Sequence, residues 1–198
     1  MNYLSFFDEI EEIVVYDDLT KFLGVNKDGI IKFSYADIVK FAGHSCATVA
    51  GAYIVSLEGL KALYGDDLPQ RGDIKVELQK SQTDDNAGVV GSVISTITGA
   101  TQKLGFGGIP TGKYNRRDLL FFEVDIEHDI CFTRLDTGKK VYVDYKPRNV
   151  VNPMAILKSA IGPNAKPEDI KSFPKRFQDM VKTVFDNIDK VIEITVVN

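Results

Sequence analysis

The feature that most constrains this chain is an apolar segment at residues 46–63 whose first half consists mainly of small side chains. Gly43 precedes the segment and Gly65 follows it, and glycine is typical of positions where a helix ends. The run from Ala47 to Ala52 reads Ala-Thr-Val-Ala-Gly-Ala. Small side chains allow another backbone to approach closely, so the segment predicts a helix at the centre of the fold.

Segments with the pattern of β-strands follow this helix. Residues 74–78 alternate apolar and polar side chains, which predicts a half-buried strand. We expect further strands at residues 119–124, 130–135, 141–145 and 191–196, the first two joined by a hairpin at residues 127–129. Residues 88–98 are ambiguous between a buried strand and a helix.

Helices are predicted at both ends of the chain. Apolar residues at helical spacing indicate a surface helix over residues 6–14, and Ser34 is a good N-cap for a helix at 35–41. We expect a short helix at 155–161 and a longer one at 174–189. The predicted fold is α+β, with a mixed β-sheet packed against the helix at 46–63 and additional N- and C-terminal helices. We expect one domain over residues 1–198, with a core at about 33–146 and a C-terminal helix and strand within 147–198.

The charge and hydropathy of the chain exclude several classes of partner. The formal net charge is −4 and the isoelectric point about 5.3, which argues against nucleic acid and against an anionic membrane surface. No apolar run reaches the ~18 residues of a membrane span, and the N-terminus lacks a secretory signal. We therefore expect a cytoplasmic protein with two reduced cysteines.

Chemistry-bearing residues are concentrated at residues 43–46, which read Gly-His-Ser-Cys. This segment holds one of the two histidines and one of the two cysteines, and we expect Ser45 to cap the helix that follows. The start of a helix stabilises an anionic thiolate. Three interpretations stay open: His44 and Cys46 bind a transition metal, most simply zinc; Cys46 is a nucleophile with His44 as its base; or both residues only pack at a helix junction.

The other histidine and cysteine are weaker candidates. Residues 128 and 131 differ by an odd number and would point to opposite faces of a strand. We expect His128 to lie in solvent on a hairpin turn and Cys131 to be a buried small hydrophobic residue.

A glycine-rich stretch between Thr98 and Arg117 carries four interspersed basic residues. Such a loop can hold an anion on its backbone N–H groups, although it matches no phosphate-binding fingerprint.

The chain resembles the FmdE-like family, which is named after a component of the enzyme formylmethanofuran dehydrogenase. The Gly-His-x-Cys segment at the start of a small-residue helix is one mark of that family. Residues 98–101 (Thr-Gly-Ala-Thr), residues 112–115 (Gly-Lys-Tyr-Asn) and the strand, Asp-x-Gly-Lys turn and strand at 132–143 are similar to its other marks. The family's second cysteine is replaced by Ala100, and a proline after the first cysteine is replaced by Ala47.

The resemblance implies an α+β domain, often dimeric, with a metal held partly by the histidine and cysteine. Together with the glycine-rich loop it makes five residues candidates for contacting a cofactor or a small anionic ligand: Thr98, Gly99, Lys113, Asn115 and Arg116. We expect a homodimeric accessory protein, with a possible partner enzyme of one-carbon metabolism. A thiol-dependent enzyme and an interaction domain with a decayed metal site are the alternatives.

Overall fold

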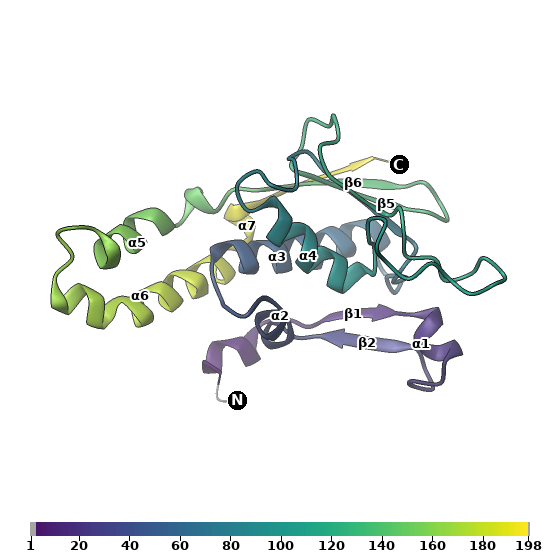
Figure 1. The fold of residues 1–198 in the computed structure, drawn as a ribbon, viewed down its shortest axis with the longest axis horizontal. Coiled ribbons are helices and arrows are strands. Elements are labelled where there is room, and N and C mark those ends of the chain that lie inside the picture. Colours follow the sequence, from purple (N-terminus) through teal and green to yellow (C-terminus); the bar gives the residue numbers. More distant parts are fainter. Residues whose placement is uncertain (1–2, 198) are drawn as a thin grey trace.

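The computed structural model describes residues 3–197, which form an α+β fold (Figure 1). Its strands are β1 (Ile13–Tyr16), β2 (Ile30–Phe33), β3 (Ile74–Leu78), β4 (Leu120–Phe121), β5 (Ile130–Arg134), β6 (Lys140–Tyr145) and β7 (Ile192–Val197). Its α-helices are α1 (Asp18–Phe22), α2 (Tyr35–Ala42), α3 (Ala47–Tyr64), α4 (Ala87–Thr98), α5 (Pro153–Ile161), α6 (Pro167–Phe185) and α7 (Ile188–Val191), and two 3₁₀ helices are η1 (Ser5–Glu9) and η2 (Pro147–Asn149).

The main sheet has five strands in the order β4-β3-β5-β6-β7. All neighbouring strands are antiparallel except β3 and β4, which are parallel, so the predicted mixed sheet is confirmed. Strands β1 and β2 form a separate antiparallel pair. Helices α3 and α4 lie between the two sheets (Figure 1), and the Tyr53 hydroxyl of α3 lies 2.7 Å from the Glu11 carbonyl oxygen and 2.8 Å from that of Phe33.

Helix α3 is central, as the sequence predicts, and most of its side chains are buried. Its small residues admit aromatic rings and not, as expected, another backbone. A Cβ atom on Gly51 would lie 2.1 Å from Cε1 of Tyr145, and one on Gly59 would lie 2.7 Å from Cε2 of Phe132. Both rings come from the main sheet, so the two glycines set how closely the helix and the sheet pack.

The ambiguous segment at residues 88–98 is a helix, α4, that packs against α3. The predicted N-terminal helix at 6–14 is wrong beyond its first residues. A 3₁₀ helix ends at Glu9, and Ile13 and Val15 then point into the core from β1. Pairing with β2 and burial of these β-branched side chains outweigh the helical spacing of the apolar residues.

The predicted hairpin between 119–124 and 130–135 is also wrong. Only Leu120 and Phe121 form a strand, and this strand pairs in parallel with β3 on the side opposite β5. The chain turns away at Glu123, whose φ is +59°, and the Val124 N–H donates to the Leu78 carbonyl. Strand β5 therefore pairs with β3 and β6.

The C-terminal helices α5 and α6 pair as a hairpin that projects from the main body (Figure 1). Helix α6 begins at Pro167, seven residues before the predicted start at Pro174, because a proline is favourable in the first turn and acids follow it there. Strand β7 lies within one residue of the predicted bounds. Within residues 3–197, none of the helices has the length and apolar character needed to span a membrane.

Candidate functional site

Residues 43–46 form the connection between α2 and α3. A capping box between Ser34 and Asp37 starts α2, as predicted for Ser34, and Gly43 ends that helix with φ +78°. Cys46 is the N-cap of α3 and its backbone is extended, although its side chain makes no capping hydrogen bond. The sequence therefore places His44 and Cys46 in a tight turn before a long central helix.

His44 is exposed, and one of its ring nitrogens is already engaged. Its Nδ1 lies 3.0 Å from the carbonyl oxygen of Ala42. Because a carbonyl only accepts, Nδ1 carries the proton in the neutral ring, and Nε2 then keeps a lone pair. This arrangement is the one that metal-binding histidines commonly adopt.

Cys46 is a half-buried free thiol with tyrosines near it. Burial raises the pKa of Tyr35 and of Tyr145 well above the usual range, and the charge of the Cys46 thiolate adds to both shifts. Both hydroxyls therefore stay protonated at neutral pH. They lie close enough to Cys46 to sense its charge.

The backbone around Cys46 is held by three other elements. The Ser45 hydroxyl lies 2.9 Å from the Tyr35 hydroxyl and does not cap α3, so the expected cap is wrong; a buried phenol is its partner instead. The Tyr145 hydroxyl donates to the Ala47 carbonyl at 2.8 Å, and the Gln178 amide donates to the Ser45 carbonyl at 3.1 Å. The turn that carries the thiol is therefore fixed from α2, β6 and α6.

A complete metal site is not formed by one chain over the part that the structure describes. Within residues 3–197, no three His, Cys, Asp or Glu side chains come together in a way that could hold an ion. His44 and Cys46 are thus two candidate ligands without a third from the same chain. Ala100 is fully buried, and its N–H donates to the Thr98 hydroxyl.

His128 and Cys131 lie in the main sheet region. Cys131 is 1% exposed, as predicted, and burial raises the pKa of its thiol. His128 does not lie free in solvent: its Nδ1 is 2.8 Å from an Asp144 carboxylate oxygen, and the ring is half-buried. Burial opposes ionisation of Asp144, but the hydrogen bond from His128 holds the pKa of that carboxyl below its usual value.

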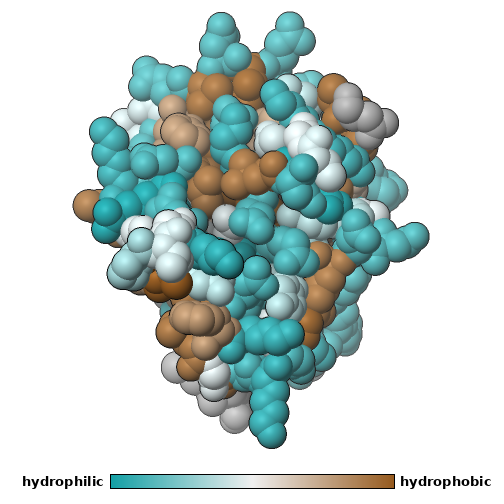
Figure 2. All heavy atoms as spheres, turned by 90° about the vertical axis from the view of Figure 1, so that its right-hand side faces the viewer, coloured by the Kyte–Doolittle hydropathy of each residue, from teal (hydrophilic) through white to brown (hydrophobic). Residues whose placement is uncertain are grey.

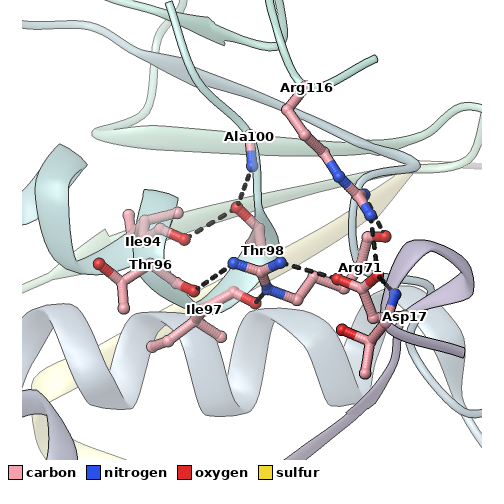
Figure 3. Close-up of polar contacts among 9 residues, drawn as sticks. Asp17, Arg71, Ile94, Thr96, Ile97, Thr98, Ala100 and Arg116 are labelled. Carbon is pink, nitrogen blue, oxygen red and sulfur yellow. Dashed lines mark hydrogen bonds and ion pairs between the residues drawn. The ribbon is translucent and has the colours of Figure 1, made fainter. Parts of the chain in front are cut away.

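The glycine-rich loop contributes to a buried charge cluster that the sequence analysis did not predict (Figure 3). Asp17, which is 1% exposed, accepts from Arg71 at 2.7 Å and from Arg116 at 3.0 Å. Arg71 also donates to the carbonyls of Thr96 and Ile97 at the end of α4, where cations are favourable. The two partners of Asp17 stand 54 and 99 positions away, so no local pattern reports them.

Each charge in this cluster is shifted by its surroundings. Burial opposes ionisation of Asp17, but the hydrogen bond from the Thr20 N–H and the two guanidinium groups hold the pKa of this carboxyl below its usual value. Burial lowers the pKa of Arg116, and its Nε has no hydrogen-bond partner in the part of the chain that the structure describes. Burial raises the pKa of Asp73 nearby.

The five predicted ligand-contacting residues divide into two groups. Thr98 is buried and its hydroxyl donates to the Ile94 carbonyl, while Gly99 ends α4 with φ +74°. Lys113, Asn115 and Arg116 instead line one cavity of about 450 Å³ together with Arg71 and Asp73. His44 and Cys46 are not among the residues that line this cavity.

The surface at this end of the molecule, seen from the right-hand side of Figure 1, mixes hydrophilic and apolar side chains (Figure 2). Phe22 is exposed there and stacks on Tyr114, with ring centroids 5.3 Å apart. The rim of the cavity therefore includes an aromatic side chain beside the charged ones.

Comparisons with known proteins give a distant likeness in fold. No protein-family model and no curated protein matches the sequence. One solved structure that resembles this chain is a tungsten formylmethanofuran dehydrogenase FmdE-like protein from Syntrophus aciditrophicus. The likeness covers 84% of this chain and 73% of the other, at 14% identity and a TM-score of 0.40.

Proposed function

We propose that this protein is a cytoplasmic accessory protein that binds a transition metal, most simply zinc, through His44 and Cys46. The observation that carries the proposal is the hydrogen bond between Nδ1 of His44 and the Ala42 carbonyl. It fixes the tautomer whose exposed Nε2 is a metal ligand. Cys46, two residues away, supplies a thiol that no capping bond occupies.

The remaining ligands come from outside the chain in this proposal. Structural zinc takes four ligands, and the described residues offer two at this position. His44 is exposed, so a second copy of the chain can approach it and contribute the same pair. A symmetric dimer with one bridging ion, or a metal-bearing small molecule, would complete the coordination. A partner enzyme of one-carbon metabolism would then be the recipient.

Metal analysis of protein purified without chelator or metal-affinity steps tests this directly. We expect about 0.5 to one equivalent of zinc per chain after equilibration, as an order-of-magnitude range for a bridging or a separate site. His44→Ala and Cys46→Ala should both lose the metal. The matched controls are His128→Asn and Cys131→Ser, which change the other histidine and cysteine.

Two outcomes contradict the proposal. One is wild-type protein that takes up no metal, and the other is equal loss of metal in the control variants. Metal-free protein whose Cys46 is alkylated rapidly by iodoacetamide below pH 7 would favour the thiol enzyme, with His44 as its base.

A second function, binding of a small anionic ligand, is favoured by the cavity that contains three of the predicted contact residues. Arg116 lies at this cavity with an Nε that has no partner among residues 3–197, and Lys113 is exposed beside it. Sulfate or phosphate at constant ionic strength should raise the melting temperature through preferential binding to the native state. Lys113→Gln should reduce that rise, whereas Lys103→Gln in the same loop should not. Equal rises in all three proteins would contradict it.

A further inference from the structure

A second cavity, of about 470 Å³, lies beside the N-terminal half of α3. It is enclosed by α3, the end of β3, the start of α4, the start of β5, the end of β6 and the segment that leads into α5. The lining residues used below are Thr48, Ala52, Val55, Lys80, Asp85, Ala87, Val90, Asp129, Tyr145, Arg148 and Met154. None of the residues discussed as metal or anion ligands lines it.

The small residues of α3 and α4 explain why this space is open. Thr48, Gly51, Ala52 and Val55 recur at helical spacing, so they share one face of α3. The Tyr145 ring fills the space above Gly51. Ala52 and Ala87 are both buried and too short to reach across the remainder, so an apolar floor is left between the helices and the sheet.

The charged groups at the cavity are already paired, with one exception. Lys80 and Asp85 form an ion pair at 2.6 Å, and Asp129 accepts a hydrogen bond from the Tyr145 N–H at 3.0 Å. Arg148 is exposed, and it makes no ion pair or side-chain hydrogen bond to any of residues 3–197. An apolar cavity with one such guanidinium at its side is suited to a ligand with an apolar body and an anionic group.

We propose that this cavity binds a small organic anion, with its apolar part against Val55, Val90 and Met154 and its acidic group on Arg148. The volume lies within the range of about 300–1,000 Å³ that is usual for small-molecule sites. Arg148 offers a planar set of donors that pairs with two oxygens of a carboxylate, sulfonate or phosphate. The site is separate from His44 and Cys46 and does not depend on metal binding there.

Two fluorescent probes of the same shape separate the roles of the charge and of the cavity. 8-Anilinonaphthalene-1-sulfonate carries a sulfonate, and N-phenyl-1-naphthylamine has the same rings without it. We expect saturable binding of the sulfonate probe at one site per chain in the folded wild-type protein. Arg148→Gln should weaken the sulfonate probe by about tenfold, the effect of losing one charge-assisted contact, and leave the neutral probe unchanged.

Three variants locate the binding. Thr48→Phe should fill the cavity and remove both probes, with far-UV circular dichroism confirming the fold. Lys27→Gln changes the net charge by the same amount as Arg148→Gln at an exposed loop and should bind both probes normally. Because exposed Arg148 has no hydrogen bond or ion pair to lose within residues 3–197, its variant keeps the test decisive even where Thr48→Phe does not fold. Unchanged sulfonate affinity in Arg148→Gln, equal loss of both probes in it, or probe binding that survives in folded Thr48→Phe overturns the proposal.

Discussion

The turn that carries His44 and Cys46 differs in almost every respect from the cluster of Asp17, Arg71 and Arg116. The turn holds rare residues close together in the sequence, and its histidine is exposed. The cluster is built from common residues far apart in the sequence, and its carboxylate is buried with both arginines bonded to it. Groups available for binding and groups required for folding are thus separated in this molecule, and substitutions should separate them too.

The largest loss of stability is expected for Asp17→Ala. Removing this carboxylate leaves buried Arg116 and half-buried Arg71 without their shared counter-ion, and breaking such a pair costs about 3–5 kcal/mol. Urea unfolding measures the change. Asp18→Asn, at the exposed neighbouring position, should cost less than about 0.5 kcal/mol. Similar losses in both variants would mean that the cluster contributes nothing special.

Gly72→Ala should be the next most damaging change. A Cβ there would lie 0.8 Å from Nη1 of Arg116, and the residue has φ +95°. The buried guanidinium would have to leave its partners, at a cost of about 2–3 kcal/mol. Gly24→Ala is the matched control, because its φ is +71° and the space around it is open. Only the left-handed backbone cost of about 1–2 kcal/mol should remain there.

Acid should weaken the fold partly through Asp17. The pKa of this carboxyl is lower in the folded protein than in the unfolded chain, where it is about 3.9. As the pH falls through about 4, the unfolded chain takes up the proton first, so the stability that ionised Asp17 contributes is present above that pH and declines below it. Unfolding free energies between pH 6 and 3 should fall less steeply in Asp17→Asn. An unchanged slope would refute this role.

The smallest effects on folding are expected for His44→Ala and Cys46→Ala. Neither side chain makes a capping bond or an ion pair to the described residues, so each change should alter the unfolding free energy by about 0.5 kcal/mol or less in metal-free protein. Thermal unfolding with and without zinc provides the measurement. A large loss without metal would mean that the turn is structural, which would bring it close to the Asp17 cluster in kind.

Local patterns predicted the helix at residues 46–63, the strand at 74–78 and the cap at Ser34, because glycine breaks, alternation and capping are all read within a few residues. The pairing of β4 with β3 could not be predicted in this way, since it depends on a parallel register across more than 40 residues. The site divides likewise. Lys113, Asn115 and Arg116 share a cavity as a local loop would suggest, whereas Asp17 and Arg71 join Arg116 through contacts that no spacing encodes.

The hydrogen bonds that Tyr145 and Gln178 make to the turn also bear on how the protein is produced. Ser45 and Ala47 leave the ribosome long before these two side chains exist, so the emerging turn lacks the partners that fix its carbonyls. Its thiol and imidazole would be presented without their final geometry until helix α6 has been synthesised and has docked. Acquisition of any ion at this position would accordingly be a post-translational event.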